Sequence, residues 1–208
     1  AKSCNATFAQ IAIELGPEKL ASTVETLGLT SRVTVSNKLN SEQGRFFLEK
    51  SDPDDYVGWT GIGQGDTLLP PIAMLRYMAA IANDGKMISP ILVRELRRDG
   101  DVVKHFKTQT LVDKVCSERT LREVRKLLES VGTEGTGAGF FRDTTLYTVA
   151  AKTGTAQYAD DKIGYRDGYY IGSMVAYFPA HNPRYTVLTT IHTKRQAGKS
   201  YYGGPLSG

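Results

Sequence analysis

Apolar residues recur every three or four positions at the start of the chain, a spacing typical of an amphipathic helix. Residues 3–15 predict one such helix, with Ser3 or Asn5 as its N-cap and Gly16 as its stop. The expected core face consists of Phe8, Ile11, Ala12 and Leu15.

Three further helices follow from the same pattern. Pro17 begins the first, because proline fits an opening helical turn, and Gly28 ends it. The other two span residues 70–82 and 117–131, the latter capped by Ser117. Their apolar stripes are Leu20, Val24 and Leu27, then Ile72, Leu75, Ala79 and Ala82, then Leu121, Val124, Leu128 and Val131. We expect the first two helices of the chain to form a helical hairpin.

Glycine and short polar residues mark the irregular segments. Residues 29–67 are rich in Gly, Asp, Ser and Asn and predict a long functional loop. Asp99-Gly100 favours the positive φ angles of a tight turn, so residues 86–107 predict a surface hairpin. Four glycines between 132 and 139 indicate a break in regular structure.

The last third of the chain is rich in β-branched and aromatic residues. Residues 147–156, 169–178 and 185–193 predict three antiparallel strands. The turn between the last two is too short for a crossover helix, so these two strands pair as a hairpin. Helices followed by an antiparallel sheet of about three strands indicate an α+β fold, with no repeat and no domain linker.

The segment Lys152-Thr153-Gly154-Thr155 carries the most chemical information. A glycine inside a strand marks a place where a ligand or another backbone approaches closely. Strand alternation puts the hydroxyls of Thr153 and Thr155 on one face, where both can bind a single carboxylate. Lys152 adds positive charge beside them. Taken alone, the tripeptide is equally compatible with an ordinary edge strand.

A second polar element, Ser3-Cys4-Asn5, precedes Lys152 by 149 residues, the difference between positions 152 and 3. Ser and Asn are common N-caps, so helix capping is its alternative interpretation. The ordered pair of Ser-x-Asn and Lys-Thr-Gly favours a catalytic site, because this pair, preceded by Ser-x-x-Lys, is typical of penicillin-binding proteins and serine β-lactamases.

The composition of the chain argues against several other classes of function. The chain has 26 Lys and Arg against 22 Asp and Glu, a net charge of +4 without basic runs, so nucleic acid is not expected as a partner. The three histidines lie far apart in sequence and no Cys-x-x-Cys occurs, so we expect no metal and no cofactor. Cys4 and Cys116 are expected to stay unpaired, with Cys4 as a packing residue. No apolar stretch reaches the ~20 residues of a membrane span.

The chain resembles the class B penicillin-binding proteins, which are monofunctional transpeptidases, along nearly its whole length. The matching segments begin with residues 3–16, which follow the second motif of that family. They continue with Gly61-Ile62-Gly63-Gln64-Gly65 and the helix that ends at Asn83-Asp84-Gly85, the glycines of 132–139, and Tyr201-Tyr202-Gly203-Gly204-Pro205. The resemblance implies a penicillin-binding or serine β-lactamase-like fold.

The resemblance also implies a role for each site residue. Ser3 passes a proton, Asn5 holds the acyl carbonyl of the substrate, and Lys152 bonds to Ser3 and keeps the site electropositive. Thr153 and Thr155, with Gly154 between them, bind the terminal carboxylate, and the N–H of Thr155 supplies half of an oxyanion hole. The implied ligands are stem peptides ending in D-Ala-D-Ala and β-lactam antibiotics.

The sequence departs from the family in one respect. No lysine of the chain has a serine three residues before it, so the nucleophilic Ser-x-x-Lys is absent. We therefore expect residues 1–208 to be a truncated transpeptidase domain that lacks the first-motif region and the last helix, and that is inactive alone. The resemblance implies a parent anchored by an N-terminal transmembrane helix on the periplasmic face of the inner membrane, working with a cell-wall glycosyltransferase.

Other functions stay open at this point. A serine β-lactamase or a β-lactam-sensing receptor domain shares the motifs, and a non-catalytic carboxylate-binding module would keep half of the site. A nucleotide site at Gly198-Lys199-Ser200 is disfavoured because Thr193 stands where a P-loop needs its first glycine. A Ser-His-Asp hydrolase is disfavoured because no Gly-x-Ser-x-Gly occurs.

Overall fold

The structure is a computed structural model of the chain, and it describes residues 2–36, 38–141, 147–160 and 164–195, together with Tyr202 and Pro205. Its helices are α1 (Asn5–Leu15), α2 (Pro17–Thr26), α3 (Asp54–Gly61), α4 (Pro71–Ala82), α5 (Glu118–Thr133) and α6 (Ala138–Phe141). Its strands are β1 (Thr34–Ser36), β2 (Leu39–Asn40), β3 (Met87–Ile88), β4 (Glu95–Arg98), β5 (Asp101–His105), β6 (Thr110–Val112), β7 (Ala150–Asp160), β8 (Gly164–Phe178) and β9 (Tyr185–Lys194).

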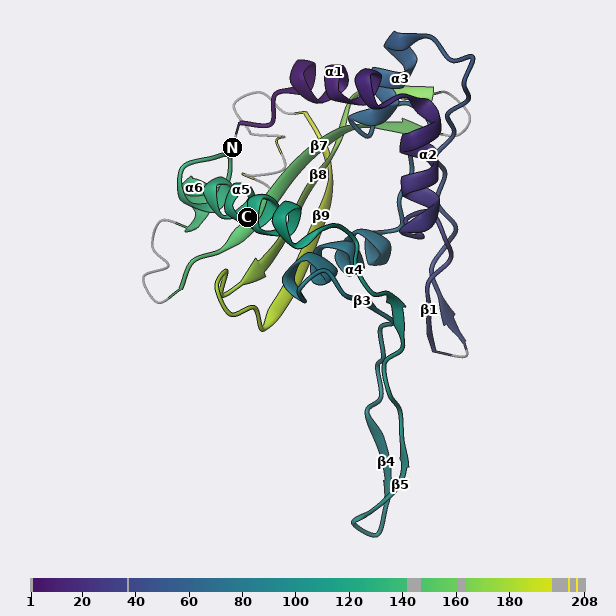
Figure 1. Cartoon of the computed structure of the whole chain (residues 1–208), viewed down its shortest axis with the longest axis vertical. Coiled ribbons are helices and arrows are strands. Elements are labelled where there is room, and N and C mark those ends of the chain that lie inside the picture. Colours follow the sequence, from purple (N-terminus) through teal and green to yellow (C-terminus); the bar gives the residue numbers. More distant parts are fainter. Residues whose placement is uncertain are drawn as a thin grey trace.

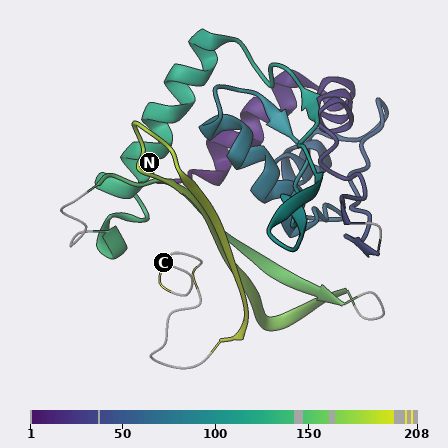
Figure 2. The same ribbon diagram turned by 90° about the horizontal axis from the view of Figure 1, so that it is seen from below.

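An antiparallel sheet of order β7-β8-β9 forms the centre of the molecule (Figure 1). The helices of the first half of the chain, purple to teal, lie together on one side of it (Figure 2). The predicted α+β class and the three strands are confirmed, although β7 extends to Asp160 and β8 begins at Gly164. The β8–β9 hairpin keeps an unbroken register from Tyr169↔Lys194 to Phe178↔Tyr185.

Two hydrophobic clusters hold helices against opposite faces of the sheet. Ala150 and Ala151 are neighbours on β7, both with 0% exposure, and strand alternation sends their side chains to different faces. Ala150 belongs to a cluster with Met78 and Ile81 of α4, Leu121 of α5 and Tyr177 of β8. Ala151 belongs to a second cluster with Val131, Val149, Met174 and Ala176. Burying one Met, Ile or Leu side chain contributes roughly 1.5–3 kcal/mol.

The helix predicted for residues 3–15 is present as α1, but its core face is different from the predicted one. Phe8, Ile11 and Leu15 are 54%, 44% and 44% exposed. Ala12, the fourth residue of the predicted face, is buried, and it packs on α3 together with Ala9 and Ile13. The N-cap prediction is wrong as well, because Cys4 occupies that position and makes no side-chain capping bond.

Helix α3 lies inside the segment predicted to be a loop, so that prediction is wrong for Asp54–Gly61. Its glycines argue against a helix in isolation. In the fold Gly61 is required, because a Cβ there would lie 2.3 Å from the Cβ of Ala12. A Cβ on Gly58 would lie 3.2 Å from the Cβ of Ala9, a tight contact that calls for a small shift. Close approach of α3 to α1 therefore outweighs the poor helix propensity of glycine.

The remaining helices are confirmed with small changes in their bounds. The apolar stripe predicted for residues 70–82 is wrong, because the buried residues of α4 are Ala73, Met78, Ala80 and Ile81. Helix α2 packs Leu20, Val24 and Leu27 inward, and α4 ends at Asn83-Asp84-Gly85. Helix α5 begins at Ser117, whose hydroxyl accepts a hydrogen bond from the N–H of Thr120. It continues to Thr133, because Gly132 lets the helix approach the carbonyl oxygen of Val149. The break in regular structure predicted for residues 132–139 is interrupted by the short helix α6, which begins at Ala138.

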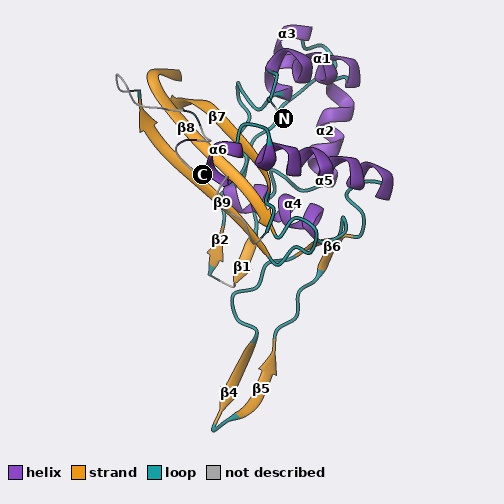
Figure 3. Ribbon diagram, turned by 90° about the vertical axis from the view of Figure 1, so that its left-hand side faces the viewer, coloured by secondary structure: helices purple, strands orange, loops and turns teal. Residues whose placement is uncertain are grey.

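The predicted surface hairpin is confirmed and forms the longest projection of the molecule (Figure 3). Asp99 and Gly100 have φ angles of 52° and 95°, as the tight turn between β4 and β5 requires. At its base, β3 pairs with β6 through Met87↔Val112, a pairing the sequence did not reveal. Within the described residues, no helix is long and apolar enough to cross a membrane.

Candidate active site

A pocket of about 710 Å³ lies where the start of α1 meets the exposed edge of β7. Ser3 and Asn5 enter it from the α1 side, and residues 152–155 enter it from β7. The structure thus brings together all of the site residues that the sequence analysis selected. The pocket is also lined by Lys2, Trp59, Ile62, Gln64, Thr136, Gln157, Tyr170, Tyr202 and Pro205.

Lys152 joins the two sides of the pocket. Its Nζ donates a hydrogen bond to the Oγ of Ser3 over 2.8 Å, across a separation of 149 residues. It also donates to the backbone carbonyl of Thr153. Burial of this half-buried side chain lowers the pKa of Lys152, because the charged ammonium is partly removed from water. A lysine with a lowered pKa exchanges protons more readily with a neighbouring hydroxyl.

Ser3 is held in an uncommon backbone conformation. Its φ angle is 49°, in the left-handed region that few residues other than glycine adopt. Such conformations cost free energy and persist where the surrounding contacts favour them. At Ser3, the contact that favours this conformation is the hydrogen bond that its hydroxyl accepts from Lys152.

Asn5 is the first residue of α1 and its side chain is exposed in the pocket. Among the described residues, its amide has no hydrogen-bond partner, so both its N–H₂ and its oxygen can serve a ligand. Helix α1 holds Asn5, Ser3 lies two residues before the helix, and α3 packs on α1 through the glycine contacts described above.

Two threonines from β7 line the pocket, and they differ in their surroundings. Thr153 is 8% exposed, and its hydroxyl lies 2.7 Å from the hydroxyl of Thr136. Thr155 is exposed toward the pocket. The sequence analysis missed Thr136, and its position among the glycines of 132–139 was the only signal. This contact allows Thr136 to orient the hydroxyl of Thr153.

Gly154 is exposed between the two threonines. A Cβ at this position would meet no heavy atom closer than the Cβ of Ser173 at 4.0 Å, and its φ angle is not in the left-handed region. The fold itself therefore does not require glycine here. The open space above Gly154 belongs to the pocket and is available to a ligand.

The glycine loop after α3 forms another wall of the pocket, which the sequence analysis did not include in the site. Ile62 and Gln64 line the pocket together with Trp59. The N–H of Gly65 donates a hydrogen bond to the hydroxyl of Tyr165 over 2.8 Å, which ties this loop to β8. Both halves of the chain thus contribute to the wall.

The two cysteines are free. Cys4 is exposed at the start of α1, so its prediction as a packing residue is wrong. Hydrogen bonds from the side chain and then the backbone of Thr7 lower the pKa of the Cys4 thiol. Among the described residues, no three His, Cys, Asp or Glu side chains gather in an arrangement that could hold a metal ion. Gly198-Lys199-Ser200 lies outside the described residues, as do Tyr201, Gly203 and Gly204.

Residues 1–208 match the family described as "Penicillin binding protein transpeptidase domain". The chain is 30% identical over 207 residues to "Stage V sporulation protein D" of Bacillus subtilis (strain 168), covering 99% of this chain and 31% of the relative. It is 29% identical over 204 residues to "Peptidoglycan D,D-transpeptidase FtsI homolog" of Mesostigma viride, covering 91% of this chain and 34% of the relative. The chain spans about a third of the length of these relatives.

Solved structures share the fold. The crystal structure of PBPA from Mycobacterium tuberculosis superimposes with a TM-score of 0.81 and 25% identity, covering 99% of this chain and 47% of that chain. Penicillin-binding protein 3 from the same organism, complexed with ampicillin, gives a TM-score of 0.79 at 25% identity, with coverage of 99% and 47%. The likeness includes both the helices and the sheet.

Proposed function

This chain belongs to the penicillin-binding protein transpeptidase family, and on that premise we propose that it supplies the proton-relay and carboxylate-binding half of a peptidoglycan D,D-transpeptidase site in a longer protein. The observation that carries the proposal is the 2.8 Å hydrogen bond between Lys152 and Ser3. It joins the two motifs across the pocket where a substrate would bind.

The proposed reaction is acyl transfer through a serine ester. A serine hydroxyl attacks the carbonyl of the penultimate D-Ala, the peptide bond breaks, and terminal D-Ala leaves as an amine that takes up a proton. The amine of a second stem peptide then attacks the ester, forms the cross-link and gives up a proton as the serine hydroxyl is restored. In this proposal the hydrogen-bonded pair of Ser3 and Lys152 delivers and collects those protons, and the 2.8 Å contact between them supports that role.

The other residues bind and orient the substrate in this proposal. Asn5 holds the acyl carbonyl with its unoccupied amide, and the N–H of Thr155 contributes to an oxyanion hole. Loss of one oxyanion donor typically costs about 10² to 10³ in rate. Thr153 and Thr155 bind the terminal carboxylate, and Gly154 lets the peptide backbone lie close to β7.

The nucleophile is proposed to come from another part of the longer protein. No Ser-x-x-Lys occurs among the 208 residues. The curated relatives extend well beyond the matched region, since the chain covers only 31% and 34% of two of them. A neighbour of known structure, penicillin-binding protein A from M. tuberculosis, was solved as an acyl-enzyme complex with a β-lactam.

Labelled penicillin tests this function. The longer protein should become covalently labelled and should release the label slowly, whereas a protein of residues 1–208 alone should not be labelled. Rapid release by the longer protein would favour a serine β-lactamase instead. If the longer protein were not labelled, only the interpretation as a carboxylate-binding module would remain. Covalent labelling of residues 1–208 alone would refute the proposal that the nucleophile comes from another part of the longer protein.

The proposed substrate also suggests a location. Peptidoglycan lies outside the cytoplasm, so we propose that the longer protein acts at the periplasmic face of the inner membrane, anchored by an N-terminal helix outside this sequence and working beside a cell-wall glycosyltransferase. Protease accessibility in spheroplasts measures this. Protection of the chain from protease outside the inner membrane would contradict it.

A further inference from the structure

Tyr165 of β8 contacts the glycine loop, residues 61–65, from the sheet side of the candidate active site. Its hydroxyl accepts a hydrogen bond from the N–H of Gly65 over 2.8 Å, and the two residues are 100 positions apart. The described lining of the pocket does not include Tyr165. Tyr165 therefore supports this wall of the pocket without facing the space where a ligand would bind.

The glycine loop carries side chains that form the wall. Gln64 lines the pocket and comes directly before Gly65. Gly65 has a φ angle of 65° and lies against the indole of Trp59, since a Cβ on it would be 3.4 Å from the Cδ1 of that ring. The N–H of Gln64 donates to the carbonyl of Trp59 over 3.2 Å. A shift of Gly65 would therefore change the positions of two pocket residues, Gln64 and Trp59.

The backbone hydrogen bonds of the loop weaken toward its end. The N–H of Gly63 donates to the carbonyl of Thr60 over 2.9 Å, whereas the bond from the N–H of Thr67 to the carbonyl of Gln64 is 3.4 Å long. The second distance exceeds the usual range of about 2.7–3.2 Å. The bond from Gly65 to Tyr165 is shorter than either. The position of Gln64 thus depends on a contact from the sheet.

A bulge in the sheet directs Tyr165 toward the helical side. β7 and β8 pair regularly until Tyr158 of β7 lies opposite residues 166–169 of β8, and pairing resumes at Ala159↔Tyr165. Extra residues on one strand bend a hairpin. Figure 2 shows the green β7–β8 hairpin turning away from the line of β9. The bend brings the Tyr165 hydroxyl to the glycine loop.

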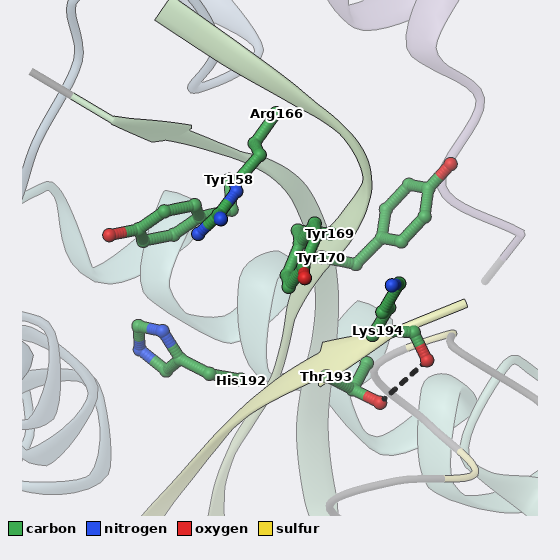
Figure 4. Close-up of a pocket in the computed structure, with 7 residues that line it drawn as sticks. All are labelled: Tyr158, Arg166, Tyr169, Tyr170, His192, Thr193 and Lys194. Atoms are coloured by element: carbon green, nitrogen blue, oxygen red, sulfur yellow. Dashed lines mark hydrogen bonds between the residues drawn. The ribbon is translucent and has the colours of Figure 1, made fainter. Parts of the chain in front are cut away.

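Cation–aromatic contacts stabilise the bulge. The guanidinium carbon of Arg166 lies 4.6 Å from the ring centroid of Tyr169, and the Nζ of Lys194 lies 5.4 Å from the same centroid. The Tyr158 ring and the His192 imidazole meet edge to face with centroids 5.8 Å apart. Figure 4 shows these side chains gathered around the bulge. The described lining of the active-site pocket includes none of them, so they serve the bend rather than the ligand.

We propose that Tyr165 is a positioning residue of the candidate active site, whose hydroxyl holds the Gly65 amide and thereby sets where the Gln64 side chain meets the ligand. The proposal rests on the proposed function for the identity of that ligand, a β-lactam or a peptide ending in D-Ala-D-Ala. Without the hydroxyl, binding should weaken while acylation keeps its rate, because the bond between Lys152 and Ser3 does not involve the glycine loop.

The test compares the longer protein that contains this chain with its Tyr165→Phe variant, which keeps the ring and removes the hydroxyl. Stopped-flow labelling at increasing concentrations of fluorescent penicillin gives the dissociation constant of the first complex and the acylation rate at saturation. Tyr165→Phe should raise the dissociation constant about 3- to 10-fold, the range of one hydrogen bond, and change the saturating rate less than about twofold. An unchanged dissociation constant, or a loss confined to the saturating rate, would overturn the proposal.

Hydrogen exchange measures the contact itself. In Tyr165→Phe the amides of residues 62–66 should exchange about 3- to 10-fold faster, because Gly65 loses its acceptor. The matched control is Tyr185→Phe, the same chemical change at a tyrosine of β9 that is 64% exposed. The control should alter neither the exchange of this segment nor the dissociation constant. Unchanged exchange in Tyr165→Phe, or an equal effect of the control, would contradict the proposal.

Gln64→Ala tests whether Tyr165 acts through Gln64. Substitutions of coupled residues have effects that do not add. In a Gln64→Ala background, Tyr165→Phe should therefore raise the dissociation constant by less than about twofold. An increase as large as that in the unmodified background would overturn the positioning role.

Penicillin labelling of the unmodified longer protein separates this proposal from the proposed function. Absence of that labelling would contradict the transpeptidase function, and hydrogen exchange would still test the contact between Tyr165 and Gly65. Normal labelling with an unchanged dissociation constant in Tyr165→Phe would contradict the positioning role alone.

Discussion

Gly61 and Gly154 lie on the two sides of the candidate active site, and different forces account for them. Gly61 is required by packing, because its α hydrogen faces the Cβ of Ala12 and a larger side chain would overlap it. Gly154 has open space above it and an ordinary backbone conformation. The first glycine thus serves the fold, whereas the second leaves open space in the pocket.

The helical side and the strand side of the site also differ in how they position their functional residues. On the helical side, close packing of α1 on α3 places Ser3 and Asn5, so their positions depend on the shape of a small interface. On the strand side, hydrogen-bonded register with β8 places residues 152–155, as Lys152↔Val175 and Thr155↔Gly172 show. Side chains at the strand edge can therefore be changed at lower cost to the fold than those at the helix interface.

The contact that joins the two sides should be the most sensitive. Lys152→Met is expected to reduce the rate of penicillin labelling of the longer protein by at least about 100-fold, because the proton relay through Ser3 is lost. Its thermal stability should not fall, because a partly buried charge is replaced by an apolar side chain. Lys126→Met, on the exposed surface of α5, is the control, with a side chain 72% exposed. Labelling unchanged by Lys152→Met would exclude the relay.

A larger side chain on the helical side should damage the fold itself. Gly61→Val is expected to lower the free energy of unfolding by about 1–3 kcal/mol, because the methyl groups overlap Ala12 and force α1 away from α3. Chemical denaturation measures the change. Gly139→Ala is the matched control, since a Cβ there has no heavy atom within 4 Å. Equal stability of Gly61→Val and the control would show that the interface adapts.

The corresponding change on the strand side should separate binding from stability. Gly154→Ala is expected to slow penicillin labelling about 10-fold, because one methyl group enters the space where the ligand approaches β7. The free energy of unfolding should change by less than about 0.5 kcal/mol, as for surface substitutions away from special features. A loss of stability as large as that of Gly61→Val would remove the contrast between the two glycines.

The smallest effect is expected from Thr136, whose hydroxyl is proposed to orient that of Thr153. Thr136→Val removes the hydroxyl 2.7 Å from that of Thr153 and should weaken penicillin acylation about 3- to 5-fold, the range of one neutral hydrogen bond. Thr136→Ser keeps the hydroxyl and should restore the rate. If serine restored nothing, the methyl group of Thr136 rather than its hydroxyl would be the relevant feature.

Sequence patterns predicted the elements whose signals are local. Helix α5 has both a capping serine and a regular apolar stripe, and the β4–β5 hairpin has a turn dipeptide that few other structures accommodate. Helix α3 could not be predicted in this way, because its glycines lower local helix propensity and are explained only by a neighbour some 50 positions earlier. The packed face of α1 was predicted only at Ala12, since small alanines rather than the large apolar side chains face α3.

The candidate site divides in the same manner. Lys152 and Ser3 were selected from their motifs, and the geometry places them in contact. Thr136 carries no motif, and only the fold brings its hydroxyl to that of Thr153. The chemical roles assigned to Ser3, Asn5 and Lys152 stay predictions.

The hydrogen bond between Ser3 and Lys152 also bears on how the chain folds. Its partners are 149 residues apart, so the two halves of the site meet only after a very large loop has closed. Contacts of such high sequence separation form slowly and late. The α5 helix and the β4–β5 hairpin, being local, can form early. During synthesis or refolding, competence to bind a ligand should therefore appear last, after secondary structure has already reached its final content.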